Sequence, residues 1–498
     1  MSEKNSVTAA SGDEPASIYN AHGVLNDDLA LALSTGPQLN PLSIQAFKLY
    51  MIVCVAFIGS LGWGFDTSVM SGINGMSQFT EYFGISGEGG GQGIITALLF
   101  AIFNFGNIAA SFVAGPVADR WGRKGGMFAA SIILLAGIST VTAAQSRIYL
   151  FFGRFLLGFG STMNTSSALW RGRLAGLYNA FQFVGSIVCS GLVIATGRMN
   201  SSLSWRIPCA IQFAPTVVLA VGVLFIPETR HARFWRGYHG NGDVNAPLVV
   251  LEWQELEAGI KVDGTDKRWW DYSELFNSRG ARYRTLVISW MGLCYLFSGI
   301  GIFNYITVVF DLAGVKSQER RLIFTFVSVA LGALGALFGA SIVDKVGRRP
   351  LWLWGTAGCA ISMALAAGNK FQPIWSPKDM LIIFNFIMNM VYMPLQGMYA
   401  SECLDFSNRA KGLSLFALVQ SLCSLCNLFA GSVAFQNIGW KYMLVPACWD
   451  VVETIVIYLI AVETKGRTLE ELDEIFEDLH PVNASLQRKQ GSREAEKQ

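Results

Sequence analysis

Charged side chains are scarce in this chain of 498 residues. They account for 14% of the sequence, whereas hydrophobic side chains account for 52%. Soluble globular domains carry roughly 25% charged residues, so this deficit excludes a large soluble enzyme and predicts a polytopic membrane protein. The net charge is only +2, and the composition therefore gives no reason to expect nucleic acid as a partner.

Histidine is rare, and cysteine occurs without the arrangement of a metal site. The four histidines all fall outside the long apolar runs, at His22, His231, His239 and His480. A proton relay within the membrane must therefore use carboxylates. Cys423 and Cys426 have the spacing of a metal or redox pair, but they lie in an apolar run with no further ligands nearby. No nucleophile–base set and no cofactor-binding loop is evident, so we expect neither an enzyme nor a cofactor or metal.

Long apolar segments are abundant. Twelve of them reach the roughly 20 residues that a helix needs to cross a bilayer. They form two groups of six, at 49–72, 93–117, 126–144, 148–168, 174–196 and 207–226, and at 285–310, 322–343, 350–367, 379–401, 412–434 and 441–462. The pattern predicts an all-α membrane protein whose twelve transmembrane helices form two pseudo-symmetric six-helix bundles in the lipid bilayer.

The polar segments divide the chain into five parts. We expect a disordered cytosolic tail at 1–47, because that stretch is polar and has no sustained period. A first bundle at 48–228 and a second at 284–463 flank a cytosolic central loop at 229–283, and a second cytosolic tail occupies 464–498. Part of the loop, 249–256, has the pattern of a short amphipathic helix, either interfacial or simply solvated.

A basic hairpin occurs once in each half. The second apolar segment is followed by residues 119–124, Asp-Arg-Trp-Gly-Arg-Lys, and the eighth by residues 344–349, Asp-Lys-Val-Gly-Arg-Arg. Each copy leaves room only for a tight turn between its spans, which the glycine favours. A hairpin repeated in this way indicates a duplicated membrane bundle and hence a transporter.

Positive charges gather on one side of the predicted bundle. The turns after segments two, four, eight and ten are rich in lysine and arginine, whereas the loop after segment one holds Glu81 and Glu88 and no cation. The positive-inside rule therefore places both termini in the cytosol, and we expect the plasma membrane as the location. Asn200 then lies outside, in an Asn-Ser-Ser sequence that predicts a glycosylation site.

Taken together, the motifs resemble the sugar porter family of the major facilitator superfamily. Besides the two hairpins, the similarity includes residues 64–66 (Gly-Phe-Asp), 153–158 (Gly-Arg-Phe-Leu-Leu-Gly), 227–229 (Pro-Glu-Thr), 399–402 and 463–471. The loop segment 238–243 is similar to the fungal members, including hexose and lactose permeases. The resemblance implies alternating access to a central cavity and commonly proton symport. The expected function is secondary active transport of a sugar or similar small molecule, with protons as the second partner.

Asp66 and Arg154 are charged residues deep in predicted spans. Charges in a bilayer cost roughly 2.5–3.5 kcal/mol on insertion scales, so they are functional candidates. Asp66 lies about 25 Å from the cytosolic end of its span at about 1.5 Å per residue, and Arg154 enters from the opposite side to a similar depth. The resemblance implies that they form the proton-coupling pair, the alternative being a permanent structural ion pair. Asp450 and Glu453 in span twelve share a helix face, and we expect them to be structural or interfacial.

The resemblance also implies a cytosolic gate, in which acids hold the arginines of the basic hairpins. In the first half the candidates are Asp119, Arg120, Arg123 and Glu228. In the second half they are Asp344, Arg348, Arg349, Glu402 and Arg409. Glu402 stands seven residues before Arg409, but the corresponding position before Arg171 is Asn164. The first half therefore lacks the span-four acid of the family.

Sugar hydroxyls require amide, hydroxyl and aromatic partners. Candidates for substrate contact are Asn179 and Gln182 in span five, Tyr295, Asn304 and Tyr305 in span seven, and Asn427 in span eleven. Asn385 and Asn389 in span ten are further polar candidates, and for each of these amides helix–helix hydrogen bonding is the alternative.

Span seven departs from the family, because the amides that flank its Ser-Gly pair are replaced by apolar residues at 295–301. This admits two alternatives: a transporter of a non-sugar metabolite, or a nutrient sensor that does not transport.

Overall fold

The computed structural model describes residues 44–85, 94–167, 173–225, 272–312, 314–368, 377–404, 409–467 and 469–486. All regular secondary structure in these ranges is helical. The first half contains α2 (Ile44–Ile73), α3 (Ser77–Tyr82), α4 (Ile94–Thr142), α5 (Arg147–Ser167), α6 (Arg173–Thr196), α7 (Leu203–Ile211) and α8 (Phe213–Phe225). The second contains α11 (Glu274–Asn277), α12 (Arg279–Phe297), η1 (Ile300–Tyr305), α13 (Ile306–Leu312), α14 (Gln318–Val346), α15 (Arg348–Gly368), α16 (Pro377–Cys403), α17 (Arg409–Ile438), η2 (Gly439–Met443), α18 (Leu444–Ile460) and α19 (Leu469–Glu477).

The helices reproduce the predicted series of membrane spans. Ten helical segments of the described residues are long and apolar enough to cross a membrane. Two of these lie in α4, on either side of Gly122, where the backbone leaves helical geometry at φ 73°. The remaining two predicted spans are α5, which carries Arg147 and Arg154, and α6, whose apolar part is Phe181–Thr196. The all-α prediction is confirmed.

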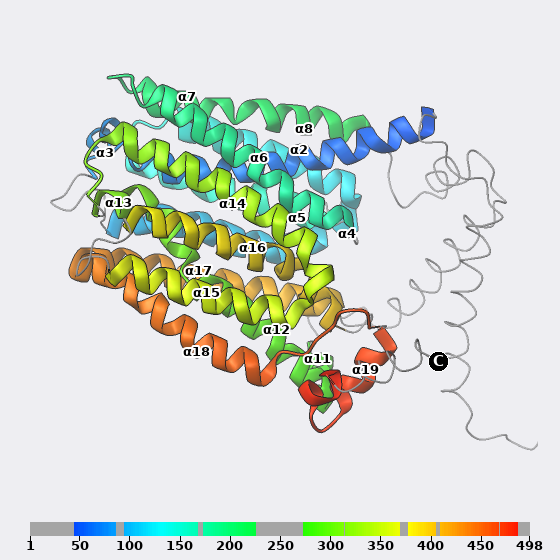
Figure 1. Cartoon of the computed structure of the whole chain (residues 1–498). Helices are drawn as coiled ribbons and strands as arrows, with labels where there is room; N and C mark the ends of the chain where they lie inside the picture. The colour runs from blue at the N-terminus through cyan, green and yellow to red at the C-terminus, as the bar shows by residue number, and fades with distance from the viewer. Residues whose placement is uncertain are drawn as a thin grey trace, which may run out of the picture. The chain divides into compact units, whose positions relative to one another are not determined.

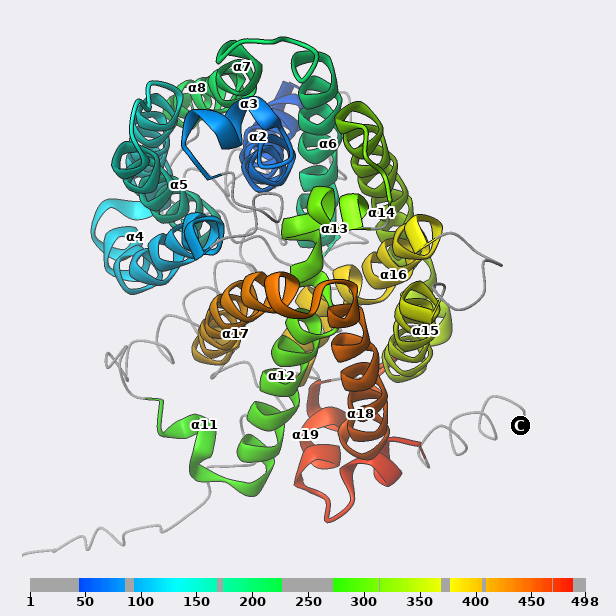
Figure 2. The same cartoon turned by 90° about the vertical axis from the view of Figure 1, so that its left-hand side faces the viewer.

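The spans form one compact unit, made of residues 53–226 and 268–498. Within it, the helices of the first half lie together, as do those of the second (Figure 1). Seen along the helices, α6 lies beside α14, and α17 lies next to the α4 side of the first half (Figure 2). Of the other unit, 1–52 and 227–267, the structure describes only 44–52. Residues 1–43 of the predicted N-terminal tail and 229–271 of the central loop, which include the predicted 249–256 helix, lie outside the described residues.

Span seven is not the single continuous helix over 285–310 that the sequence predicts. The α-helix α12 ends at Phe297, Gly299 takes up a left-handed conformation with φ 104°, and the chain continues as the 3-10 helix η1 before α13. Asn427 of α17 accounts for part of this break, because its Nδ2 donates to the carbonyl of Leu296 at the end of α12. A side-chain donor thus replaces a helical partner, and the apolar sequence of the span gives no sign of it.

Polar contacts join the two halves at the end of the bundle where α2 finishes. The Gln318 side-chain carbonyl accepts from the Ser77 backbone N–H at 3.1 Å, and its Nε2 donates to the Gly197 carbonyl at 3.1 Å. Beside it, Arg198 and Glu319 form an ion pair of 2.6 Å. We call these five residues the far-end contacts, and the opposite end, which carries the basic hairpins, the basic end. At the basic end no ion pair joins described residues of the two halves.

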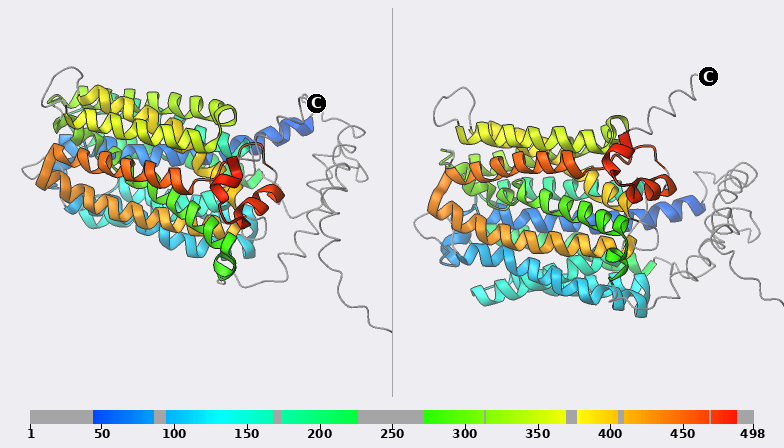
Figure 3. Two further views of the ribbon diagram at one scale, coloured as in Figure 1. Left: turned by 60° about the horizontal axis from the view of Figure 1, so that its bottom comes forward. Right: turned by 90° about the horizontal axis from the view of Figure 1, so that it is seen from below.

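The segment after α18 folds back onto the basic end of the second half. Figure 3 shows α19 beside the start of α12. Arg284 of α12 is buried, forms a 2.6 Å ion pair with Asp473 and lies over the Phe476 ring. The first part of the predicted C-terminal tail, 464–498, is therefore packed against the second bundle.

Candidate functional site

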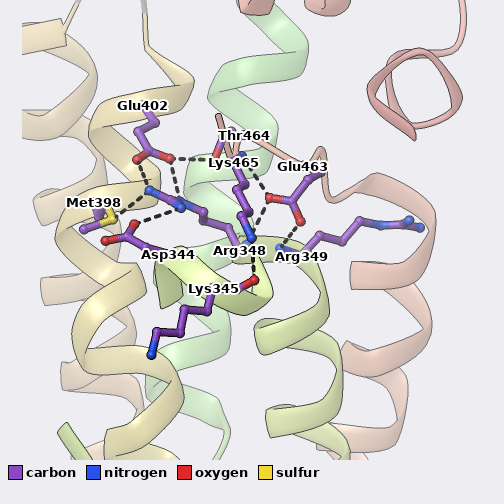
Figure 4. A network of polar contacts seen from close by, with 9 residues as sticks. All are labelled: Asp344, Lys345, Arg348, Arg349, Met398, Glu402, Glu463, Thr464 and Lys465. Atoms are coloured by element: carbon purple, nitrogen blue, oxygen red, sulfur yellow. Dashed lines mark hydrogen bonds and ion pairs between the residues drawn. The ribbon is translucent and has the colours of Figure 1, made fainter. Parts of the chain in front are cut away.

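The clearest polar cluster at the basic end surrounds Arg348, the first residue of α15 (Figure 4). Its guanidinium binds Glu402 of α16 through two hydrogen bonds, Nε to Oε2 at 3.2 Å and Nη2 to Oε1 at 2.8 Å. Asp344 adds an ion pair of 3.1 Å from the last turn of α14. The Arg348 side chain is 9% exposed and that of Glu402 26%. A paired arginine this well buried is worth more than a solvent-exposed pair, because water screens it less.

Glu463 completes the cluster from the segment after α18. Its carboxylate accepts the backbone N–H groups of Arg348 at 3.0 Å and Arg349 at 3.3 Å, which are free donors at the start of a helix. It also accepts the backbone N–H of Lys465 at 2.9 Å. The turn that permits this contains Gly347, whose φ is 104° and where a Cβ atom would lie 2.6 Å from the Glu463 carboxylate.

Thr464 links the two carboxylates of this cluster. Its hydroxyl donates to Glu402 at 2.5 Å, and it directly follows Glu463 in the chain. The cluster therefore ties the α14–α15 turn to α16 and to the segment after α18. Glu463 and Thr464 belong to this cluster but are not among the gate residues predicted from the sequence. The available signal was the Glu463-Thr464 pair itself, which repeats Glu228-Thr229 from the end of the first half.

The first-half copy of the gate is described only in part. Arg120 is exposed, and Lys124 donates from Nζ to the Leu224 carbonyl near the end of α8 at 2.7 Å. The side chains of Asp119, Arg123 and Arg409, and all of Glu228, lie outside the described residues. Asn164, at the position of the missing acid, is 4% exposed, and its Oδ1 finds no partner in the described part of the chain.

Asp66 belongs to α2 and is buried, with 6% of its surface exposed. Gly64 lets α2 approach α6 closely, because a Cβ atom there would lie 1.8 Å from the Gln182 carbonyl oxygen. The Ser186 hydroxyl of α6 donates to the Gly64 carbonyl at 2.9 Å. Small residues at such an interface are typical of packed membrane helices. The Gly-Phe-Asp motif therefore buries an acid by bringing two helices together.

Arg154 of α5 lies near Asp66 and is 3% exposed. Its guanidinium covers the Phe103 ring, with 4.7 Å from Cζ to the ring centroid. The two residues interact electrostatically, but no direct ion pair joins them, and Nε and Nη1 of Arg154 have no hydrogen-bond partner among the described residues. The structure brings the predicted coupling residues together, and their role in proton coupling stays a prediction.

The two predicted contacts in α6 are only partly described. The backbone of Asn179 belongs to α6, while its side chain lies outside the described residues. Gln182 is 7% exposed and donates from Nε2 to the sulfur of Met393 in α16 at 3.3 Å. Because this hydrogen bond joins α6 to α16, Gln182 lies where the two halves meet. A sulfur acceptor is weak, so the amide can exchange it for a better partner.

The candidates of spans seven and eleven surround the break after α12. Asn427 holds the Leu296 carbonyl and accepts from Tyr442 at 3.3 Å, and the Tyr305 hydroxyl donates to the Leu428 carbonyl at 3.0 Å. Tyr295 packs against the Tyr392 ring with 5.9 Å between centroids. Asn304 is half-buried in η1. Asn427 and Tyr305 thus stabilise the break in this conformation, and their contact with substrate stays a prediction.

Asn385 and Asn389 of α16 are used in helix packing. Asn385 donates to the carbonyl and hydroxyl oxygens of Ser328 in α14, at 2.7 and 3.1 Å. Asn389 donates to the backbone carbonyl and the side chain of Asn385, both at 2.8 Å. For Asn385 the geometry favours helix–helix hydrogen bonding, whereas both hydrogen bonds of Asn389 stay within α16 and orient Asn385.

Comparison with known proteins identifies the family. The family model described as "Sugar (and other) transporter" matches residues 51–476. The chain belongs to this family. A high-affinity glucose transporter of Kluyveromyces lactis is 26% identical to this chain, and the match covers 88% of the chain and 87% of the relative. The H(+)/hexose cotransporter 2 of Parachlorella kessleri is 25% identical, over 86% of each chain. The protein is thus a sugar-family transporter and not an enzyme.

Solved structures agree with this fold. The inward open conformation of the xylose transporter XylE from E. coli superposes with a TM-score of 0.69 at 18% sequence identity, over 86% of this chain and 99% of that one. The predicted major facilitator fold, with two six-helix halves, is confirmed.

Proposed function

We propose that this protein imports a hexose-like sugar together with protons by alternating access. The observation that carries the proton part of this proposal is the burial of Asp66 beside Arg154 with no direct ion pair between them. A carboxylate buried in this way favours either a proton or a cation partner. The named relatives, a glucose transporter and an H(+)/hexose cotransporter, support the sugar and the proton.

The coupling step follows from the two competing partners of Asp66. A proton on Asp66 removes the negative charge that attracts Arg154, so the conformation in which the two separate becomes more favourable. Loss of the proton restores the attraction. Because α2 and α5 carry these residues, the proton occupancy of Asp66 biases the packing of the first half.

The orientation in the membrane is part of the proposal. With the basic end in the cytosol, both termini are cytosolic, as the positive-inside rule favours. The far-end contacts and the exposed Asn200 then face outside, where Asn200 is available for glycosylation. We place this transporter in the plasma membrane, because import of an external sugar requires it there.

The decisive experiment is uptake of a panel of labelled sugars by transport-deficient cells, with and without a proton gradient. The parent protein should concentrate a hexose only when the gradient is present. Asp66→Asn should abolish accumulation against a concentration gradient and retain exchange, because the amide cannot carry the proton. Glu81→Gln, an exposed acid in α3, is the matched control and should behave as the parent does. An Asp66→Asn protein that still concentrates sugar as the parent does excludes this mechanism.

A non-sugar metabolite is the second candidate, and the apolar span seven favours it. Leu296 and Ile300 stand at the positions of amides in the family resemblance, and the nearby Asn427 amide is engaged by a backbone carbonyl. If the apolar side chains of span seven limit sugar binding, Leu296→Gln with Ile300→Asn should improve hexose uptake several-fold. An unchanged sugar profile, with Asn179→Ala equally without effect, would favour the non-sugar substrate.

A further inference from the structure

Two acids of α18 lie in the interior of the second half, far along the chain from Asp66. Asp450 and Glu453 are both 0% exposed, although neither belongs to the basic hairpins or to the coupling pair. Their spacing of three residues puts them on one face of α18. That face packs against α12 and α15. Two carboxyl groups are thus enclosed by protein at a depth where charge is costly.

Glu453 has the hydrogen bonds of a carboxylate. Its Oε2 accepts from the Ser298 hydroxyl of span seven at 2.6 Å and from the Tyr392 hydroxyl of α16 at 3.3 Å. Its Oε1 accepts from the Trp449 indole N–H. Three donors directed at two oxygens stabilise a negative charge, as an ionised carboxylate can only accept.

Asp450 has the opposite surroundings. Both of its oxygens are buried and accept no hydrogen bond among the residues that the structure describes, although the Ser298 hydroxyl, which donates to Glu453, lies close to them. The titratable groups that face the pair from neighbouring elements are Cys294 of α12, Cys359 of α15 and Tyr392 of α16. No lysine, arginine or histidine in the described ranges forms an ion pair with either acid. A second charge here without a partner would be costly, which favours the protonated, neutral form of Asp450.

We propose that Asp450 and Glu453 form a second proton-binding site, which holds one proton in this conformation and takes up another from water. The added proton binds a Glu453 oxygen, forms an O–H bond and changes the charge of the pair from −1 to 0. The site lacks the ring of oxygen ligands that a metal cation requires, and within the described residues no cluster suited to a metal is found. A proton is therefore the ligand that fits it.

The site acts on the break in span seven. Ser298, which donates to Glu453, directly follows the last residue of α12, and Gly299 comes next with φ 104°. Trp449 packs against Trp290 and Phe297 of α12, with ring centroids 6.3 and 5.8 Å apart. A neutral Glu453 must donate one hydrogen bond and accepts its present donors less strongly. Proton uptake therefore loosens the contacts that hold the end of α12.

This inference goes beyond the proposed function, because it requires neither a sugar substrate nor coupling at Asp66. The test is an infrared pH titration of the full-length protein in lipid vesicles without substrate, following the carbonyl band of protonated carboxyl groups. The parent should show a band from Asp450 at neutral pH. On acidification further bands should grow, one from Glu453 and others from Asp66 and the exposed acids. The two bands of the site are identified by their loss: Asp450→Asn should remove the neutral-pH band, and Glu453→Gln should remove one of the acid-dependent bands. Asp379→Asn, an exposed acid in the first turn of α16, is the matched control and should leave both bands unchanged.

Two results would overturn the site: a neutral-pH band that survives Asp450→Asn, or acid-dependent bands that all survive Glu453→Gln. If either acid variant fails to fold, Tyr392→Phe gives an independent reading. It deletes one hydrogen bond to Glu453 and should shift the frequency of one acid-dependent band, whereas the absence of any shift contradicts the proposal. Because no sugar is present, a protein that shows both bands but transports no hexose refutes the proposed function alone.

Discussion

The two basic hairpins have nearly the same sequence but different surroundings. In the second half, Arg348 is buried and bound by Glu402 and Asp344, and Glu463 accepts the backbone N–H groups that follow the turn. In the first half the residue that corresponds to Arg348 is Arg123, whose side chain lies outside the described residues, and the position that corresponds to Glu402 holds Asn164. The hairpin motif therefore recurs in the first half without the acid that holds its arginine in the second half.

This difference bears on the conformational equilibrium. In the gate that the family resemblance implies, acids that hold the hairpin arginines stabilise the state closed at the basic end. With one such acid missing, we expect a resting bias towards the state open at the basic end, as the far-end contacts of this structure also suggest. A difference of about 1.4 kcal/mol changes the ratio of two states tenfold, so a single pair matters.

The largest effect is expected from Glu402→Gln, which removes the charge that Arg348 faces. The free energy of unfolding should fall by about 2–3 kcal/mol, at the lower end of the range for buried pairs because Glu402 is 26% exposed. Thermal unfolding measures this, and cysteine labelling at the basic end measures the accompanying increase in accessibility. Arg120→Ala in the first half is the control and should change stability by less than about 0.5 kcal/mol. Equal effects of the two variants would mean that the buried Arg348–Glu402 pair contributes no more to stability than an exposed hairpin arginine does.

The second comparison uses the glycine of each hairpin. Gly347→Ala places a methyl group against the Glu463 carboxylate and strains a backbone with φ 104°, so it should destabilise by roughly 2–3 kcal/mol. Gly122→Ala strains a backbone with φ 73° and should cost about 1–2 kcal/mol. Urea or thermal unfolding of both variants gives the difference. A larger loss at Gly122 would contradict the role of Glu463.

The smallest effect is expected from Asn164→Glu, which restores an acid to the first half. Because position 164 is 4% exposed, the cost of desolvating the new carboxylate offsets most of its attraction to a hairpin arginine. We therefore expect a net gain of about 1 kcal/mol or less, which shifts the conformational ratio by up to about fivefold. Cysteine labelling of the basic end should therefore decrease. Asn164→Gln, of the same size without the charge, is the control. If both variants label alike, the missing acid does not explain the bias.

Much of this architecture could be predicted from the sequence, because the bilayer imposes long apolar segments. The predicted spans, the hairpin repeat and the proximity of Asp66 to Arg154 all depend on helix length and depth, which are simple functions of residue number. The second-half gate pair, Arg348 with Glu402, followed from the family motifs in the same way.

The break in span seven could not be predicted, because it depends on a contact between distant residues. Asn427 reaches the Leu296 carbonyl from another helix, and the intervening apolar run reads as a continuous span. The contacts of Glu463 were also missed: its Glu-Thr sequence repeats Glu228-Thr229, but the backbone N–H groups that it binds cannot be identified from the sequence. Side-chain to backbone contacts between separate helices are the common feature of both omissions.

The strength of the far-end contacts depends on the salt in the solution around them. The Arg198–Glu319 pair has side chains that are 67% and 50% exposed, and pairs of this kind are weakened by dissolved salt over a screening length of about 8 Å at physiological ionic strength. Closure at this end is thus sensitive to the external electrolyte, in contrast to the shielded Arg348 cluster at the other end. In the proposed orientation, we therefore expect the transporter to open towards the outside at different rates in a dilute medium and in a concentrated salt solution.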